Sequence, residues 1–394
     1  MLTYLKIIVI LSIGYMIVVI FLSLLPLALW MAFVIGIIVF FGGIVTFQIA
    51  KQNIRYKRID NIYKTLPKAP TFEKHKEGFV YRDLNKNGIL DAYEDPRQPI
   101  DARVEDLLSQ MTLEEKAGLL FNHFTFVQDP DNLMTFTDWV YDTYPEEMIL
   151  QKHMNTFTVF GGTNDPLKTA RVTNELQEIA SRTRLGIPIT VASDPRHHYD
   201  AGVGAGAAQE GISRWPEQLG LAATRNVSLV EEFGRISARE YRAQGIHLIL
   251  GPMADVATSP MWGRNYGTFG EQSDLVSTMT GAFISGMQSS HLSRDTVACQ
   301  VKHFPGGGPQ KDGWDSHFPY GKEQIYPSSR FNEHLQPFRA AIDAGVAQIM
   351  PYYSIPVGLD GVEQVGFNFN KAIITDLLRD TLHFDGVIGT DFSI

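Results

Sequence analysis

Cysteine is almost absent from this chain of 394 residues, in which Cys299 is the only one. A single cysteine excludes a disulfide bond within the chain and leaves the redox compartment open. An excess of positive charge is also absent: 34 Lys and Arg residues stand against 43 Asp and Glu residues, so the formal net charge is −9. We therefore expect no nucleic acid as a partner. The length suits one large domain or two ordinary ones.

Charge of either sign is missing near the start of the chain, because no charged residue lies between Lys6 and Lys51. One helix crosses a bilayer in about 20 residues, so this apolar run is about twice too long for a single crossing. Pro26 lies near the middle of the run and removes a backbone donor there. Residues 1–50 therefore predict a transmembrane helical hairpin, with crossings over roughly 5–23 and 27–49 and the lipid bilayer as a partner.

Residues 51–80 are polar and basic and show no strong periodicity, which indicates a linker. The basic residues that follow the apolar run are Lys51, Arg55, Lys57, Arg58, Lys64 and Lys68, against Asp60. By the positive-inside rule, such a flank stays in the cytoplasm. We therefore expect a membrane-anchored protein, and this rule favours a large domain that faces the cytoplasm.

The segment 81–100 contains a match to the twelve-residue calcium loop of EF-hands, over residues 83–94. Oxygen ligands fall at the required positions, and Gly88 stands at the sharp turn. The predicted ligands are Asp83, Asn85, Asn87, Ile89 through its carbonyl, Asp91 and Glu94. The sequence has no second loop to pair with this one, so we expect a structural Ca²⁺ rather than a sensor. A turn rich in Asn and Gly that holds no metal is the alternative.

Short apolar runs alternate with amphipathic segments over residues 101–394. The runs favour β-structure, as strands buried on both faces of a parallel sheet should. They cover 156–160, 187–191, 246–250, 297–301, 346–350 and 386–390, and helices are expected at 228–244, 273–289, 332–344 and 370–382. This alternation fits an α/β fold, either a (β/α)8 TIM-like barrel or a doubly wound sheet.

The positions of polar residues favour the barrel. Polar residues follow the carboxyl ends of the expected strands: Asp194, Asp255, Lys302, His303, Tyr353 and Asp391. In a barrel these ends form one rim, where catalytic groups gather. Taken alone, Lys302 and His303 are more often structural than catalytic, and Asp391 is more often a helix N-cap.

Five motifs follow one another along the chain at a spacing typical of a barrel. They are Met111-Thr112-Leu113-Glu114-Glu115-Lys116, Ser193-Asp194-Pro195-Arg196-His197, Trp262-Gly263-Arg264 with Phe269-Gly270-Glu271, Lys302-His303-Phe304-Pro305-Gly306-Gly307-Gly308, and Thr390-Asp391-Phe392. Together they resemble glycoside hydrolase family 3, the β-glucosidase and related family, from about Asp83 to Asp391. The resemblance implies a retaining exo-β-glycosidase of the β-glucosidase type that acts on a β-glycoside or oligosaccharide and needs no cofactor for catalysis.

The resemblance also implies roles for single residues. Asp391 would be the nucleophile that forms a covalent glycosyl-enzyme, which needs a proton donor close by. The terminal sugar would be bound by Asp194, Arg264, Lys302, His303 and Tyr353. We therefore expect these residues to converge on one sugar-sized hollow. Members of the family usually work outside the cytoplasm, which leaves the side of the membrane open.

The sequence departs from the family's pattern in two ways. Phe392 stands where the family usually has Trp, and the chain stops at Ile394 after at most seven barrel strands. In many members the general acid/base is a Glu on a following α/β domain. We therefore expect a barrel without its final strand or strands, which a missing C-terminal domain or a second chain completes. An inactive truncated remnant or sugar-binding fragment is the alternative.

The loop after His303 offers another acid. It carries Asp315-Ser316-His317, and hexosaminidases of the family use an Asp–His pair on this loop as acid/base. An Asp that orients His317 and stabilises its charged form is physically reasonable. A β-N-acetylhexosaminidase that uses His317 is therefore the second alternative, although the segment 308–313 resembles the β-glucosidase branch.

Overall fold

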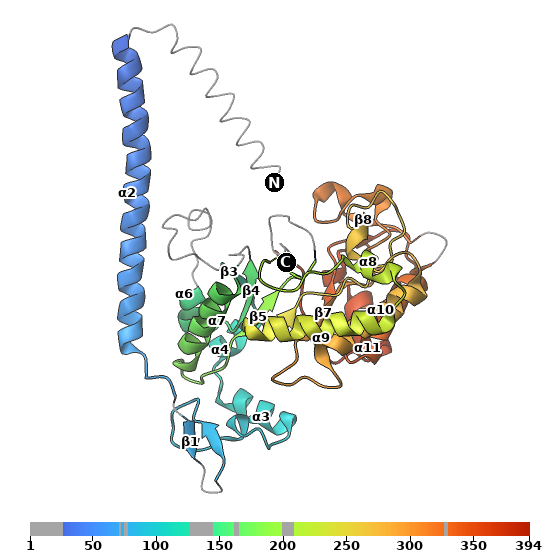
Figure 1. Ribbon diagram of the computed structural model, residues 1–394, viewed down its shortest axis with the longest axis horizontal. Coiled ribbons are helices and arrows are strands. Elements are labelled where there is room, and N and C mark those ends of the chain that lie inside the picture. The colour runs from blue at the N-terminus through green and yellow to red at the C-terminus, as the bar shows by residue number, and fades with distance from the viewer. Residues whose placement is uncertain are drawn as a thin grey trace. The chain divides into compact units, whose positions relative to one another are not determined.

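The computed structural model describes residues 27–70, 72–74, 78–126, 145–160, 165–198, 209–326 and 330–394. The chain divides into two compact units, Met1–Leu66 and Pro67–Ile394. The described part of the first unit is one helix, α2 (Leu27–Thr65; Figure 1). Residues 51–65, which were expected in a linker, belong to this helix, and Lys64 in its last turn pairs with Asp60.

The predicted membrane hairpin is contradicted by this helix. Among the helices of the described residues, none is both long enough and apolar enough to cross a membrane. The bounds of α2 also differ from the prediction, because the helix does not end with the apolar run but continues through the charged residues to Thr65. The crossing predicted over 27–49 and the membrane-anchored localisation are therefore wrong, and the expected bilayer partner is left without support. The crossing predicted over 5–23 lies outside the described residues.

The second unit is built on a sheet of seven strands in the order β11-β9-β7-β6-β5-β4-β3. Every neighbouring pair in this sheet is parallel. The strands are β3 (Asn122–Phe126), β4 (Thr156–Phe160), β5 (Thr190–Ser193), β6 (Leu248–Ile249), β7 (Ala298–Phe304), β9 (Gln348–Pro351) and β11 (Val387–Ile388). This parallel order fits the TIM-like α/β fold that the sequence predicted.

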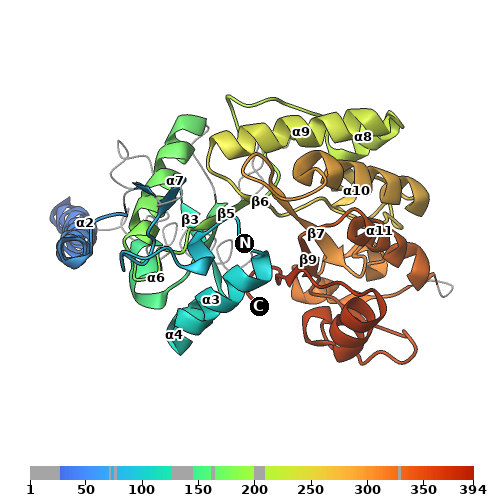
Figure 2. The same ribbon diagram turned by 90° about the horizontal axis from the view of Figure 1, so that it is seen from below.

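Helices connect successive strands and lie outside them, as Figure 2 shows for α7, α9, α10 and α11. They are α6 (Pro145–Lys152), α7 (Pro166–Ser181), α8 (Gln218–Ala223), α9 (Val227–Ala243), α10 (Ser273–Gln288), α11 (Phe331–Asp343) and the π-helix η7 (Ala372–Thr381). Smaller elements are the antiparallel pair β1 (Phe72–Lys74) and β2 (Val80–Arg82), α3 (Ile100–Gln110), α4 (Leu113–Gly118), and the parallel pair β8 (Glu323–Gln324) and β10 (Ile355–Pro356). Single 3₁₀ turns are η1 (Ala92–Glu94), η2 (Asn265–Gly267), η3 (Lys311–Gly313), η4 (Pro319–Gly321) and η6 (Phe367–Phe369).

The sheet curls so that its two edge strands approach each other. Phe124 on edge strand β3 packs against Phe392, which follows the other edge strand β11, with 4.8 Å between the ring centroids. Phe392 also packs against a buried cluster of Ala192, Leu248, Leu250 and Met350, which lie in β5, in β6 and just after it, and in β9. The carboxyl ends of β5, β7, β9 and β11 therefore face a common space.

Helices α9 and α10 pack closely because glycine lies at their contact. A Cβ atom on Gly286 would lie 2.2 Å from the carbonyl oxygen of Glu231 on α9, and one on Gly234 would lie 2.8 Å from that of Phe283 on α10. No side chain fits at these distances. The buried residues of α9 recur at helical spacing and so lie on one face: Val230, Phe233, Gly234, Ser237, Ala238 and Tyr241. This packing fixes the outer layer behind β6 and β7.

Candidate active site

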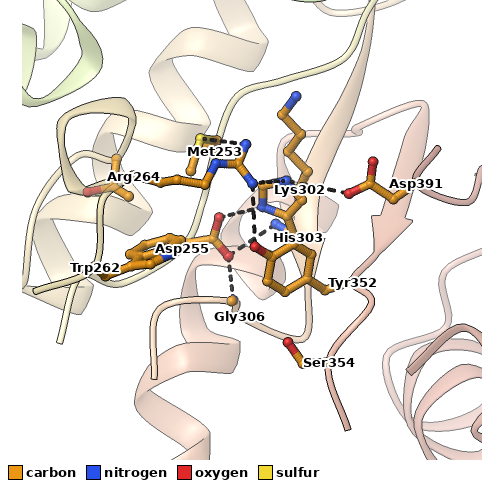
Figure 3. A network of polar contacts seen from close by, with 12 residues as sticks. Met253, Asp255, Trp262, Arg264, Lys302, His303, Gly306, Tyr352, Ser354 and Asp391 are labelled. Carbon is orange, nitrogen blue, oxygen red and sulfur yellow. Dashed lines mark hydrogen bonds and ion pairs between the residues drawn. The ribbon is translucent and has the colours of Figure 1, made fainter. Parts of the chain in front are cut away.

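Polar side chains gather at the carboxyl ends of several strands of the sheet (Figure 3). Asp194 directly follows β5, Lys302 and His303 come just before the last residue of β7, and Asp391 comes shortly after β11. The structure thus brings together residues that lie up to about 200 positions apart in the sequence. A parallel sheet has this effect because all its carboxyl ends lie along the same edge.

The first contact at this edge is an ion pair across two strands. Lys302 Nζ donates to Asp194 Oδ1 at 2.6 Å, and both side chains are about nine-tenths buried. A buried pair of this kind costs about 3–5 kcal/mol to break by removing one partner, because the other charge is left uncompensated. The pair therefore fixes the Lys302 ammonium at the rim between β5 and β7.

His303 is held from one side by Asp255. The His303 Nδ1 lies 2.8 Å from Asp255 Oδ2, and the His303 backbone N–H donates to Asp255 Oδ1 at 3.1 Å. The backbone N–H of Gly307 donates to the same Oδ1. Burial raises the pKa of Asp255 to about 6, although these backbone donors and Arg264 act in the opposite direction. Burial, with the charge of Arg264, holds the pKa of His303 well below its usual range.

Arg264 lies on the other side of the His303 ring. Its Nη1 is 3.2 Å from His303 Nε2 and 3.4 Å from the hydroxyl of Tyr352, and its Nη2 is 3.8 Å from the sulfur of Met253. Burial lowers the pKa of Arg264, but the nearby Tyr352 and Asp315 outweigh it and raise the pKa above its usual range. Arg264 therefore stays charged beside a neutral imidazole.

Asp391 directs one carboxylate oxygen toward the histidines His303 and His317. Its Oδ1 accepts the backbone N–H of Phe392 at 2.8 Å, whereas its Oδ2 is buried and has no hydrogen-bond partner among the described residues. This Oδ2 lies 3.9 Å from His303 Nε2 and 3.8 Å from His317 Nε2. A buried carboxylate oxygen without a hydrogen-bond partner is costly, and a catalytic role, a bound water or an ion explains such an atom.

His317 reaches Asp391 from the loop that follows β7. Its Nδ1 lies 2.6 Å from Asp315 Oδ1, and Asp315 Oδ2 accepts the indole N–H of Trp262 at 3.3 Å. Burial raises the pKa of Asp315, but the hydrogen bond to His317 and the charge of Arg264 outweigh it and hold the pKa well below its usual range. Asp315 is thus an anion that orients the other ring nitrogen of His317 toward Asp391.

Tyr353 contacts the turn that carries Asp391. Its hydroxyl donates to the carbonyl oxygen of Phe392 at 2.6 Å, and its ring packs against His317 with 4.8 Å between centroids. Burial, together with the charge of Asp391, raises the pKa of Tyr353 above its usual range. Tyr353 is therefore a neutral hydroxyl at the rim.

The structure brings together every residue for which the resemblance implied a sugar or nucleophile role. Two features go beyond the sequence expectations. Trp262, which was expected only as part of a motif, is 1% exposed and donates its indole N–H to Asp315. Asp255 and Tyr352 received no role, although Asp255 was placed after a strand as Asp194 was, and this shared position is the signal that could have found it.

The predicted calcium ligands lie together in one loop before α3. The carboxylate of Asp83 accepts the backbone N–H groups of Asn87 and Gly88, and that of Glu94 accepts those of Leu84 and Asp91. Among the described residues, no group of three or more His, Cys, Asp or Glu side chains is arranged to hold a metal ion. The loop therefore holds its shape through its own hydrogen bonds, and Ca²⁺ stays a prediction.

A cavity of about 530 Å³ lies elsewhere, next to α8 and the start of α10. Its lining includes Leu219, Ala222, Asn265, Phe269 and Leu275, and it contains none of the polar residues that surround His303. We base the candidate site on the convergence of charged groups rather than on this cavity, because the chemistry lies at the strand ends.

Comparison with known proteins gives the family context. The family model for the glycosyl hydrolase family 3 N terminal domain matches residues 114–394. Beta-glucosidase C of Emericella nidulans is 46% identical over 313 residues, which cover 79% of this chain and 50% of that protein. The periplasmic beta-glucosidase/beta-xylosidase of Dickeya chrysanthemi is 41% identical over 324 residues, which cover 80% of this chain and 49% of that protein. The chain spans about half the length of these curated relatives.

Solved structures show the same fold. A glycoside hydrolase family 3 beta-N-acetylglucosaminidase from a Paenibacillus species aligns with a TM-score of 0.60 at 25% identity, over 71% of this chain and 49% of that chain. The beta-glucosidase of Listeria innocua in complex with glucose aligns with a TM-score of 0.58 at 25% identity, over 73% of this chain and 37% of that chain.

Proposed function

The chain belongs to glycoside hydrolase family 3, and from this we propose that it is a retaining exo-β-glycosidase of the β-glucosidase type with Asp391 as its nucleophile. The substrate is a β-glycoside or oligosaccharide. Relatives named as beta-glucosidases at 41–46% identity support this substrate class.

One observation carries the proposal. The Oδ2 atom of Asp391 is buried and has no hydrogen-bond partner within the described part of the chain, and it lies 3.9 Å from His303 Nε2 and 3.8 Å from His317 Nε2. A nucleophilic carboxylate must keep one oxygen free for the anomeric carbon, and a proton donor must lie near the leaving oxygen. Asp391 supplies the free oxygen, whereas His317 as the proton donor belongs to the second candidate.

The reaction proceeds in two balanced steps. In the first, Asp391 Oδ2 forms a bond to the anomeric carbon while the bond to the leaving oxygen breaks, and that oxygen takes a proton from the general acid. In the second, water gives a proton to the same group, now a base, and its oxygen replaces the carboxylate at the anomeric carbon. The enzyme returns to its starting state, and the configuration at the sugar is retained.

The terminal sugar is held by the charged groups around His303. Lys302 Nζ and the guanidinium of Arg264 only donate hydrogen bonds, whereas Asp194 accepts them. A sugar hydroxyl both donates and accepts, so the Asp194–Lys302 pair and Arg264 together satisfy it. These buried charged groups would close the site beyond the terminal sugar, which fits exo action.

A β-N-acetylhexosaminidase is the second candidate, and the arrangement of His317 favours it. Asp315 binds Nδ1 at 2.6 Å, so Nε2 is directed toward Asp391. This pair gives the chain a general acid of its own. The solved structure of a beta-N-acetylglucosaminidase at 25% identity supports the candidate.

A fluorinated suicide substrate tests the nucleophile. We expect 2,4-dinitrophenyl 2-deoxy-2-fluoro-β-glucoside to add one sugar mass to the peptide that contains Asp391. Asp391→Asn should take no label, whereas Asp385→Asn, which changes an exposed carboxylate nearby, should label normally. Turnover of the 2,4-dinitrophenyl 2-acetamido-2-deoxy-β-glucoside separates the two candidates, because a donor without fluorine at C2 is hydrolysed rather than trapped. A folded sample that takes no label and turns over neither donor contradicts both candidates and favours a sugar-binding fragment.

A further inference from the structure

Asp255 is the most deeply buried carboxylate near the candidate site, at 0% exposed, and three nitrogens contact it. Two are the backbone N–H groups of His303 and Gly307, which donate to Oδ1, and the third is Nδ1 of the His303 ring, 2.8 Å from Oδ2. A carboxylate is satisfied as an acceptor only, so each partner must bring its own proton. The His303 ring therefore carries a proton on Nδ1.

The opposite side of the ring leads independently to the same tautomer. A guanidinium has no acceptor and always donates. Arg264 Nη1 lies 3.2 Å from His303 Nε2, so Nε2 has to offer a lone pair. A proton on Nε2 would point at another N–H group inside a buried site. The neighbours of His303 thus assign a proton to Nδ1 and a lone pair to Nε2.

The ring has little room to leave this position. It packs on Tyr352 with 4.4 Å between ring centroids. A Cβ atom on Gly307 would lie 3.0 Å from Asp255 Oδ1 and 2.9 Å from the Tyr352 ring, so this turn admits only glycine against the pair. The burial that lowers the pKa of His303 acts in the same direction, because it disfavours a second proton.

We propose that Asp255 is a positioning residue that fixes His303 as the neutral tautomer with its proton on Nδ1, so that Nε2 keeps its single lone pair, which Arg264 faces in the free protein and which a bound sugar hydroxyl would share with Arg264. The second half of this inference rests on the proposed function, and the first half does not. His303 thereby accepts a hydrogen bond from the substrate, whereas Lys302 donates one, and this difference selects the orientation of the hydroxyl that they share. Asp255 itself does not touch the sugar.

The tautomer can be measured directly in the full chain. With ¹⁵N-labelled histidine, long-range ¹H–¹⁵N spectra distinguish a protonated from an unprotonated ring nitrogen, and a His303→Gln variant assigns the signal. At neutral pH we expect Nδ1 of His303 to be protonated and Nε2 to be unprotonated. An imidazolium, or a proton on Nε2 alone, overturns the inference without any variant.

Asp255→Asn tests the cause of the tautomer. The amide oxygen can still accept the two backbone N–H groups, and its NH₂ then faces Nδ1, so Nδ1 loses its acceptor. We expect the fraction of molecules with the proton on Nδ1 to fall measurably, even though Arg264 still favours a lone pair on Nε2. Asp95→Asn is the matched control, because Asp95 is a buried carboxylate that pairs with Arg97 away from the site, and it should leave the His303 signal unchanged. A folded Asp255→Asn protein that keeps the wild-type fraction with the proton on Nδ1 contradicts the proposal; if this variant does not fold, the wild-type spectrum decides.

A glucose-mimicking iminosugar gives the second readout. We expect Asp255→Asn to weaken its binding by about 10- to 100-fold, since a buried polar group loses its partner, and Asp95→Asn to bind like the wild type. Unchanged binding by a folded Asp255→Asn protein contradicts the role toward the sugar. If the wild-type chain binds no iminosugar, the proposed function fails, while the spectrum still decides the tautomer.

Discussion

The ring of Phe124 on the first strand of the sheet packs against the ring of Phe392, which directly follows Asp391, at 4.8 Å between centroids. This contact joins the two edges of a seven-stranded sheet whose edge strands β3 and β11 are not paired with each other in the described part of the chain. The position of Asp391 therefore depends on a residue more than 260 positions earlier in the chain.

Phe124→Ala should loosen this contact. Because the ring is half-buried, we expect a loss of about 2–3 kcal/mol in the free energy of unfolding, below the range for a fully buried Phe. Urea unfolding measures it. Phe369→Ala, which removes an exposed ring, is the control and should cost little. Equal losses in the two variants would show that the edge contact contributes nothing specific.

His317→Ala should separate proton transfer from nucleophilic attack. We expect kcat/KM for a substrate with a poor leaving group to fall by about 10²- to 10⁴-fold, because the leaving oxygen loses its acid. A dinitrophenyl glycoside needs no proton on its leaving group, so its first step should be nearly unaffected. His291→Ala changes an exposed histidine and should behave as the wild type. The same loss with both leaving groups would exclude His317 as the acid.

His198 should make the protein sensitive to acid. Burial lowers the pKa of His198 to about 4. Its Nε2 is buried and has no hydrogen-bond partner among the residues that the structure describes, while Nδ1 contacts the carbonyl of Pro216. The pKa is lower in the folded state, so the stability it confers is complete above about pH 6.5 and is lost as the pH falls toward 4. The loss is at most about 3 kcal/mol.

Urea unfolding across this pH range measures the effect. We expect the stability of His198→Gln to fall less steeply than that of the wild type between pH 6.5 and 4. His291→Gln should keep the full slope. A parallel curve for His198→Gln would mean that other groups, such as His247 and His334 with the same direction of shift, carry the whole dependence.

The loop over 83–94 should respond to Ca²⁺ if the sequence prediction holds. A chelator should then lower the melting temperature of the wild type and leave that of Asp83→Ala unchanged. Loss of the Asp83 hydrogen bonds to Asn87 and Gly88 destabilises the variant with or without metal, so the response to the chelator is the decisive measurement. Asp101→Ala, at an exposed carboxylate, should keep the response; a wild type indifferent to the chelator would end the calcium hypothesis.

Periodicity in the sequence predicted most of the fold. The helices expected at 273–289 and 332–344 are found at Ser273–Gln288 and Phe331–Asp343. The strand expected at 187–191 begins instead at Thr190, since Pro188 has no N–H for a central strand. Strand β3 was missed because Asn122, His123 and Thr125 interrupt its apolar pattern. The membrane prediction failed because run length alone does not show where a helix ends.

The sequence predicted the site residues that directly follow a strand, but not the role of a residue that depends on contacts with a distant segment. Position after a strand identified Asp194, Lys302 and Asp391, because a parallel sheet brings such positions to one edge. The role of Asp255 depends on its contacts with His303 and Gly307, which come from a later turn of the chain. No local pattern encodes a contact of that kind, so only the folded arrangement reveals it.

Asp391 follows a very short strand. β11 has two residues, Val387 is 56% exposed, and the strand is held to its neighbour by the bonds from Val387 N to Ala347 O and from Gly389 N to Ile349 O, with the side chain of Gln300 on the carbonyl of Gly389. Such a segment unfolds locally more readily than the long central strand β7. A sugar that contacts both Asp391 and Lys302 would stabilise this edge of the sheet. The order of β11 should then rise with the occupancy of the site by the sugar. Slower amide exchange at Val387 and Gly389 would report a bound ligand even without turnover.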